Sequence, residues 1–158
     1  MQKNQSYTVS EAQKKVEYYC TYQERCHHEV IRKLREMNMI PQAIDIIMGK
    51  LIEGDYLNET RFAQHFSGGK FRIKKWGKER ILRELKRRNI SDYNIKLALS
   101  EISEEDYYNT AKELADKFWR ANSHRSFFER RKKVVDALRY RGWESGLIYE
   151  LINTLTED

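Results

Sequence analysis

The segment ILRELKRRNISDYNIKLALSEI, residues 81–102, contains two runs of apolar residues at helical spacing. Ile81 and Leu85 are four residues apart, which places them on one face of a helix. Ser91 is a suitable N-cap for a second helix because its hydroxyl can accept a bond from a free backbone N–H. The run that follows has three- and four-residue spacing: Ile95, Ala98, Leu99 and Ile102. The segment therefore predicts a pair of helices joined by a short turn.

The same pattern occurs three times along the chain, at offsets of 51 and 53 residues. Leu34 aligns with Leu85 and Leu138. Five further apolar columns share this register: Val30, Ile81 and Val134; Met39, Ile90 and Trp143; Ile44, Ile95 and Ile148; Ile47, Ala98 and Leu151; Leu51, Ile102 and Leu155. Unrelated helix pairs with similar loops would also align in part, but six columns without a gap favour tandem repeats.

An additional helix precedes each pair, at 10–22, 58–67 and 103–120. Ala63 and Ala115 align between the second and third of these helices. The sequence therefore predicts an all-α, elongated array of three tandem three-helix repeats. Its parts are a tail at 1–9 and repeats at 10–55, 56–102 and 103–155. Polar residues at suitable positions predict the helix starts: Ser10 with Gln13, Ser103 with Asp106, Ser126 with Glu129, and the N-caps Asn58 and Ser91.

The composition excludes several classes of protein. The 158 residues contain 30 Lys and Arg against 24 Asp and Glu, one Pro and seven Gly. No apolar run approaches the roughly 18–20 residues of a membrane span. Nineteen aromatic residues (10 Tyr, 6 Phe and 3 Trp) argue against disorder, and the scarcity of Gly and Pro argues against a β-sandwich. The start of the chain resembles no signal peptide, and two cysteines cannot make a disulfide framework, so we expect a cytoplasmic protein.

The net charge of +6 is concentrated in two segments. Residues 70–88 hold ten basic and two acidic side chains, a net +8, and residues 125–141 hold seven and two, a net +5. The remainder carries −7. Two basic helices at matching places in repeats 2 and 3 are therefore predicted on an acidic scaffold.

Basic and aromatic residues alternate in the first segment, where Phe71 and Trp76 flank Lys74 and Lys75. Basic side chains attract phosphates, and an exposed aromatic ring can stack on a single-stranded base. The alternative is that Trp76 lies in the core, and the basic segments could face solvent or an acidic protein surface. Charge alone does not choose between DNA and a protein.

No catalytic or metal site is apparent. Cys20, Cys26, His27 and His28 match no metal-ligand spacing, so Cys20 is expected to be a small core residue and Cys26 to begin a helix. Gly68-Gly69-Lys70 lacks the spacing of a phosphate-binding loop and is expected to be a flexible loop. We expect no enzymatic activity and no cofactor.

Three stretches of repeat 2 resemble the RecX family, regulators of the bacterial RecA recombinase. They are YLNETRFA (56–63), KFRIKKWGK (70–78) and ILRELKRRNI (81–90), and the resemblance extends over about residues 10–155. It implies an all-helical array of three three-helix repeats and no enzymatic activity. It also implies binding in the groove of the RecA filament on single-stranded DNA and inhibition of ATPase and strand exchange. Cys26 and Asn38 depart from the family, which usually has a hydroxyl residue and a glycine at these positions.

The resemblance marks Phe62, Gly77, Ile81, Leu85 and Ile90 as structural, with Gly77 expected to permit the turn into the basic helix. The expected contacts with the filament or DNA are all basic: Arg72, Lys74, Lys75, Lys78, Arg80, Arg83, Arg87, Arg130, Arg131, Lys132, Lys133 and Arg139. A monomer that binds naked single-stranded DNA weakly is expected. The alternatives are a freestanding nucleic-acid-binding protein that acts without a recombinase and a general protein-interaction scaffold.

Overall fold

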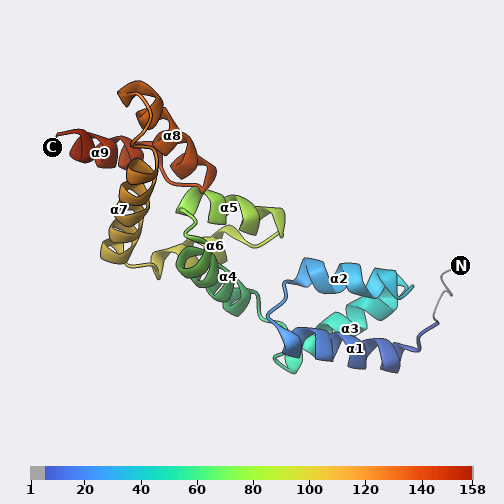
Figure 1. The fold of residues 1–158 in the computed structure, drawn as a ribbon. Coiled ribbons are helices and arrows are strands. Elements are labelled where there is room, and N and C mark those ends of the chain that lie inside the picture. The colour runs from blue at the N-terminus through green and yellow to red at the C-terminus, as the bar shows by residue number, and fades with distance from the viewer. Residues whose placement is uncertain (1–5, 158) are drawn as a thin grey trace, which may run out of the picture.

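A computed structural model describes residues 6–157, which form nine helices and no strand. Figure 1 shows them as an elongated array, with the N-terminal and C-terminal helices at opposite ends. None of the helices in this part of the chain is long and apolar enough to cross a membrane. The helices are α1 Val9–Tyr22, α2 His27–Glu36, α3 Pro41–Glu53, α4 Glu59–Lys74, α5 Lys78–Arg87, α6 Asp92–Ser100, α7 Glu104–Ala121, α8 Phe127–Tyr140 and α9 Ser145–Thr156.

The prediction of three three-helix repeats is confirmed. The most extensive packing between helices occurs within the sets α1–α3, α4–α6 and α7–α9. Of the six aligned apolar columns, all members are buried except Met39 and Leu155, which are partly buried. The columns are therefore the sides of the helices that face the core, as the spacing predicts.

The turn between the second and third helices has the same geometry in every repeat. Asn38, Asn89 and Gly142 occupy equivalent positions, and all have positive φ, of 60°, 58° and 88°. The following N–H donates back across the turn at 3.1 Å, to the carbonyl of Leu34, Leu85 or Leu138. This is a helix end closed by a left-handed residue, which asparagine tolerates better than most residues. Asn38 therefore ends its helix in the left-handed conformation, although the sequence has asparagine where the family usually has glycine.

Repeats 2 and 3 share one hydrophobic core, whereas repeat 1 has its own. The fused core contains Phe71, Tyr107 and Trp143, whose rings are in contact. Trp143 is almost fully buried, and its indole N–H donates to the Lys75 carbonyl at 3.1 Å. The Tyr107 hydroxyl accepts from the Lys78 N–H at 2.9 Å and donates to the Glu144 carboxylate. Burial and this carboxylate raise the pKa of Tyr107 well above its usual value, so it stays a donor at physiological pH.

Backbone contact completes the junction between repeats 2 and 3. The Gly77 N–H donates to the Arg141 carbonyl at 2.8 Å, and the Glu79 N–H donates to Gly142 at 3.1 Å. Gly77 has an ordinary φ of −78°, so the prediction that it provides turn freedom is wrong. Its role is close approach, because a Cβ there would lie 2.3 Å from the Gly142 oxygen.

Four of the five expected helix caps are confirmed: Asn58, Ser91, Ser103 and Ser126 each accept from a backbone N–H three residues later. The prediction for Ser10 is wrong. Thr8 caps the first helix and forms a reciprocal capping box with Glu11, so Val9 is already helical. Residues 1–5 of the expected tail lie outside the described residues.

The fourth helix is longer than expected. It was predicted to end at Ser67, with a loop at Gly68-Gly69, but α4 continues to Lys74. Two glycines in a helix cost about 1 kcal/mol each relative to alanine. The continuation buries Phe71 against Tyr107, with ring centroids 6.0 Å apart, and this packing outweighs the cost. The first basic segment therefore consists of the end of α4, a turn and α5, rather than one helix.

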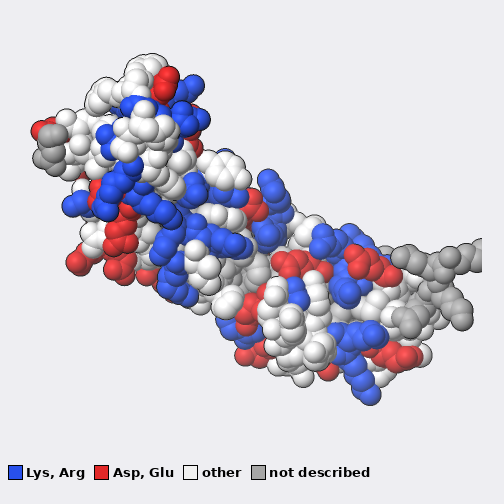
Figure 2. Space-filling model, viewed as in Figure 1, with Lys and Arg blue, Asp and Glu red and all other residues white. Residues whose placement is uncertain are grey.

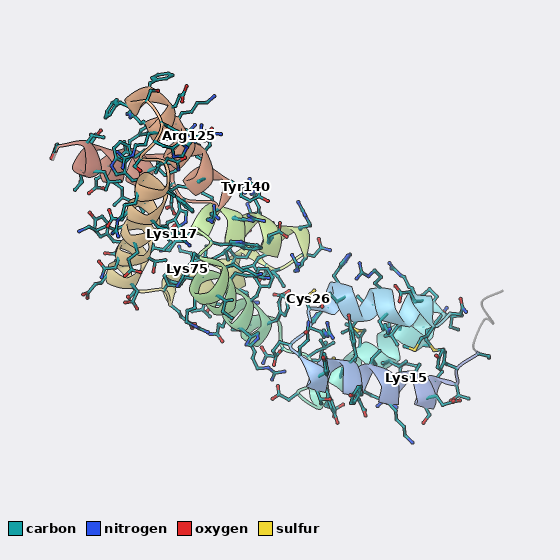
Figure 3. The ribbon with its side chains drawn as sticks, viewed as in Figure 1. Lys15, Cys26, Lys75, Lys117, Arg125 and Tyr140 are labelled. Atoms are coloured by element: carbon teal, nitrogen blue, oxygen red, sulfur yellow. The ribbon has the colours of Figure 1, made fainter. Side chains whose placement is uncertain are left out.

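Polar contacts link repeat 1 to repeat 2. The Arg61 guanidinium lies 2.6 Å from the Glu24 carboxylate and 3.1 Å from that of Asp55. Arg88 lies 3.8 Å from Glu29. Repeat 1 also contributes Cys26, which lies between repeats 1 and 2 (Figure 3). Its side chain is fully buried and belongs to the core of repeats 2 and 3. This junction depends more on charge than the junction between repeats 2 and 3.

We expect Arg61→Ala to lower the free energy of unfolding by about 1 kcal/mol, since the side chain is about one-third exposed and solvent screens its ion pairs. The loss should shrink at high salt, which screens the same pairs in the unsubstituted protein. Urea denaturation at low and at high salt measures both effects. An equal loss at both salt concentrations would contradict an ionic role for this side chain.

Candidate functional site

The basic surface of repeat 2 is assembled from three short pieces of chain. Arg72 and Lys74 lie in the last turn of α4, and Lys75 follows as its C-cap with a left-handed φ of 58°. This conformation ends the helix and reverses the chain toward α5. Helix α5 then supplies Lys78, Arg80, Arg83 and Arg87. Figure 2 shows basic side chains gathered in a band over repeats 2 and 3, while both signs alternate over repeat 1.

Arg80, Arg83 and Arg87 share one side of α5, because they are three and seven residues apart. The opposite side carries Ile81 and Leu85, which are fully buried. Arg83 and Arg87 are exposed at the surface, and Arg87 makes a solvent-exposed pair with Glu84 at 3.6 Å. Arg88 bonds Glu84 at 2.9 Å and lowers the pKa of that carboxyl. Glu84 is therefore ionised and pairs with Arg87 and Arg88. Arg83 has no ion pair in the part of the chain that the structure describes, so no acidic side chain there balances its charge.

Arg80 and Lys78 contribute to the fold as well as to the charge. The Arg80 guanidinium lies 4.2 Å from the centroid of the Trp76 ring and 4.8 Å from that of Tyr140, and it donates to the Tyr140 carbonyl at 3.2 Å. Lys78 lies 4.7 Å from the Tyr107 ring. Both side chains bridge repeats 2 and 3 and are partly buried. They are less available to a partner than the sequence suggests.

Trp76 is neither fully in the core nor free to stack on a base. Its ring packs edge-on against Phe66, and Lys70 and Arg80 both lie over it at about 4–5 Å. The ring is partly buried among these groups. Trp76 therefore positions Lys70 and Arg80 on the surface.

The basic residues of α8 do not share one face. Four consecutive residues, Arg130–Lys133, turn through most of the helix circumference. The Arg130 Nε donates to the Trp119 carbonyl at 2.7 Å, and Arg139 donates to the Tyr149 hydroxyl at 2.8 Å. Arg131 is partly buried near the Tyr149 ring. Among the basic residues of this helix, Lys132 and Lys133 are exposed and have no hydrogen-bond or ion-pair partner in the described chain, and the exposed acidic residues Glu129 and Asp136 lie on the same helix.

Six predicted contact residues are therefore exposed and have no hydrogen-bond or ion-pair partner for their side chains within residues 6–157. Five of the others have internal partners, and Arg87 has one solvent-exposed ion pair. Uncompensated cations on a rigid pair of repeats attract an extended anionic partner. The six are Arg72, Lys74, Lys75, Arg83, Lys132 and Lys133.

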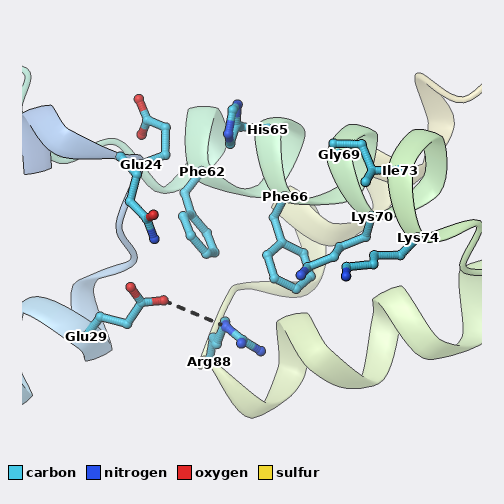
Figure 4. Close-up of a pocket in the computed structure, with 11 residues that line it drawn as sticks. Glu24, Glu29, Phe62, His65, Phe66, Gly69, Lys70, Ile73, Lys74 and Arg88 are labelled. Carbon is cyan, nitrogen blue, oxygen red and sulfur yellow. Dashed lines mark ion pairs between the residues drawn. The ribbon is translucent and has the colours of Figure 1, made fainter.

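A cleft of about 340 Å³ lies between repeat 1 and repeat 2 (Figure 4). Glu24 and Glu29 come from repeat 1, and Lys70, Lys74 and Arg88 lie on the side of repeat 2. Phe62 and Phe66 form its apolar wall. The carboxylates are engaged by arginines, Glu24 by Arg61 and Glu29 by Arg88. Neither is placed as an independent acid or base.

The cysteines are buried thiols. Cys20 and Cys26 are free, and burial raises the pKa of each to about 11. Cys26 is the N-cap of α2, as expected, and its thiol donates to Glu29 at 3.4 Å. No group of three or more potential metal ligands occurs within residues 6–157.

We expect neither thiol to react with a disulfide reagent in the folded protein at pH 8. The thiolate is the reactive form, and with a pKa of about 11 only about one thiol in a thousand is ionised at that pH. Labelling should appear in denaturant and, for the native protein, increase as the pH rises toward 11. Rapid labelling of the native protein at pH 8 would contradict the buried placement of both residues.

A second aromatic and basic surface lies on repeat 1 and was not anticipated from the sequence. It brings together α1 residues Lys14, Lys15, Tyr18 and Tyr22 with Lys33 of α2. The α1 residues recur at three- and four-residue spacing, which is the signal that could have revealed them. A count of charges along the sequence did not reveal this surface, because Glu11 and Glu17 balance Lys14 and Lys15 in the same stretch.

Comparison with known proteins gives consistent matches to one family. The family model described as "RecX, second three-helix domain" matches residues 58–99, and "RecX, third three-helix domain" matches residues 104–152. These ranges correspond to α4–α6 and α7–α9.

Among curated relatives, the regulatory protein RecX of Lactobacillus johnsonii is 26% identical over 129 residues, which is 82% of this chain and 48% of the relative. That of Bacillus cytotoxicus is 26% identical over 140 residues, 89% of this chain and 52% of the relative. The chain spans about half the length of these relatives.

Solved structures show the same fold. The crystal structure of RecX from Lactobacillus salivarius has a TM-score of 0.83 at 25% identity, covering 95% of this chain and 97% of that one. A crystal structure of a regulatory protein RecX also has a TM-score of 0.83, at 22% identity, covering 92% of this chain and 73% of that one.

Proposed function

The chain belongs to the RecX family, whose two domain models together match more than half of it, and we propose that it regulates a RecA-type recombinase by binding the filament that the recombinase forms on single-stranded DNA. Bound there, it inhibits ATP hydrolysis and strand exchange and so modulates DNA repair and recombination. It acts in the cytoplasm, as a monomer, by binding rather than by catalysis.

The observation that carries this proposal is the fused pair of repeats 2 and 3. Shared core packing and the hydrogen bonds of Gly77, Glu79 and Trp143 hold the two repeats in a fixed relation. Exposed cations from both repeats are thereby held at fixed spacing. A filament presents its DNA and protein groups at a regular spacing, so a rigid array of charges fits it better than a flexible one.

Sedimentation with preformed recombinase filaments tests the proposal. Filaments are assembled on single-stranded DNA with a non-hydrolysable ATP analogue, and binding is compared with binding to the same DNA without recombinase. We expect clear binding to filaments and much weaker binding to naked DNA at the same salt concentration.

The alternative, a freestanding nucleic-acid-binding protein, predicts the opposite preference. Binding to naked DNA would then match or exceed binding to filaments. The logarithm of affinity would fall with the logarithm of salt concentration at a slope of about 0.7 per phosphate contacted. That result would contradict regulation through the filament.

A further inference from the structure

From the geometry of repeat 1 we infer a second site, which binds single-stranded nucleic acid by stacking bases on Tyr18 and Tyr22. This site goes beyond the proposed function, since it lies on the repeat farthest from α8 and requires no recombinase. Figure 3 shows Lys15 of this surface at one end of the molecule and Arg125 of the third repeat toward the other.

The two tyrosine rings are available to a ligand. Tyr18 is 70% exposed and Tyr22 is 72% exposed, so most of each side chain is accessible to solvent. They lie one helical turn apart on α1, with ring centroids 6.5 Å apart and planes tilted by 33°. Within residues 6–157, neither ring has a cation or a further aromatic ring against it. Base stacking on an exposed ring is tolerant of sequence.

Tyr19 also lines this surface, but its side chain is partly buried. The Arg25 guanidinium lies 3.7 Å from the centroid of its ring, and the Arg25 Nε donates to the Tyr19 carbonyl at 3.1 Å. Arg25 is also 3.9 Å from Glu29, so its charge is partly compensated. Together these groups fix the connection between α1 and α2 and hold the neighbouring tyrosines in place.

Lysines lie around the tyrosines, and their positive charge favours a negatively charged ligand. Lys14 and Lys15 of α1 and Lys33 of α2 line a hollow of about 500 Å³ together with the tyrosines. Two carboxylates lie nearby: Glu11 bonds Thr8, and this bond together with the charges of Lys15 and Lys14 lowers its pKa, while Glu17 accepts from Gln13. Lys15 lies 5.3 Å from the centroid of the Tyr7 ring and Lys33 lies 5.7 Å from that of Tyr19, and no ion pair holds either lysine within residues 6–157. The surface therefore combines lysines outside ion pairs with exposed tyrosine rings, the combination by which proteins bind single strands. An acidic peptide would use the cations and leave the rings without a planar partner.

The test is binding of the whole protein to fluorescein-labelled oligothymidylate, followed by fluorescence anisotropy without recombinase. The paired change Tyr18→Ala and Tyr22→Ala should raise the Kd by about tenfold or more, because the stacking surface is lost. Tyr18→Phe with Tyr22→Phe should bind normally, since the ring faces remain. Tyr93→Ala is the matched control, because Tyr93 is 75% exposed on repeat 2 and outside this surface.

The salt dependence separates stacking from charge. Lys14→Gln, Lys15→Gln and Lys33→Gln together should reduce the salt slope by about 2, at roughly 0.7 per phosphate, whereas the alanine pair should leave the slope unchanged. Repeating the alanine pair in a protein with Lys74, Lys75, Arg83 and Arg87 changed to glutamate removes the contribution of repeat 2.

Two outcomes overturn the inference. One is oligothymidylate binding that is the same in the alanine pair as in Tyr93→Ala. The other is tyrosine-dependent binding of a poly-glutamate peptide with no tyrosine-dependent binding of the oligonucleotide, which would identify the partner as protein. Either result leaves filament regulation untouched, and failure of filament binding would leave this site untouched.

Discussion

Trp143→Ala is expected to lower the free energy of unfolding by about 3–5 kcal/mol, the usual cost of truncating a fully buried tryptophan. Trp143 is 1% exposed, contacts Tyr107 at a ring-centroid distance of 4.5 Å and donates to Lys75 across the junction of repeats 2 and 3. Truncation leaves both a cavity and a carbonyl without its partner. Thermal unfolding followed by circular dichroism should show a Tm lower by about 10 °C.

Trp119→Ala is the matched control for this substitution. Trp119 is only partly buried, and its ring contacts Arg130 and the exposed Phe127. We expect a smaller loss of stability, because less surface leaves a packed environment. Equal losses for the two tryptophans would show that Trp143 does not hold the repeats together as described.

Charge reversal at Lys74, Lys75, Arg83 and Arg87 is expected to weaken inhibition of a RecA-type ATPase strongly while leaving the fold intact. The side chains are exposed, and only Arg87 has an ion pair, so each reversal should change stability by no more than about 0.5 kcal/mol. Replacing four cations by four anions converts attraction to repulsion. The concentration for half-inhibition should rise by roughly a hundredfold at low salt.

The matched control reverses four basic residues elsewhere, so that the net charge changes equally. Arg35, Lys50, Lys96 and Lys112 are all exposed and have no side-chain ion pair in the described chain. We expect this variant to inhibit nearly as well as the unaltered protein. Equal weakening by both sets would mean that total charge, rather than the surface of α4 and α5, determines binding.

The repeat architecture could be predicted from the sequence because it depends on local spacing. Leu34, Leu85 and Leu138 are fully buried at equivalent positions, and the left-handed turns at Asn38, Asn89 and Gly142 keep the same register. In each repeat, the same pattern of apolar residues is buried between the helices, and the same turn joins the second helix to the third. Periodicity alone was therefore sufficient for this part.

Tertiary contacts determine what the sequence did not predict. Helix α4 passes through Gly68 and Gly69 because Phe71 packs on Tyr107, a residue 36 positions away. Gly77 is required by the approach of Gly142, which no local pattern indicates.

The same limit applies to the candidate site. The clustering of basic residues was visible, but Arg80 and Arg130 have partners on other helices, at Tyr140 and Trp119. Their availability depends on contacts distant in sequence, so charge counting overestimated the free surface. On repeat 1, charge counting instead underestimated the basic surface. The charges of Lys14 and Lys15 are cancelled in the count by Glu11 and Glu17, so the lysines beside the tyrosines did not stand out.

The most direct test of filament regulation is titration of the unaltered protein into a RecA-type ATPase assay on single-stranded DNA, with co-sedimentation measured on the same samples. We expect ATP hydrolysis to fall progressively as the protein is added, in parallel with its appearance on the filaments. Undiminished hydrolysis at every ratio, with no protein sedimenting with the filaments, would contradict the proposed function.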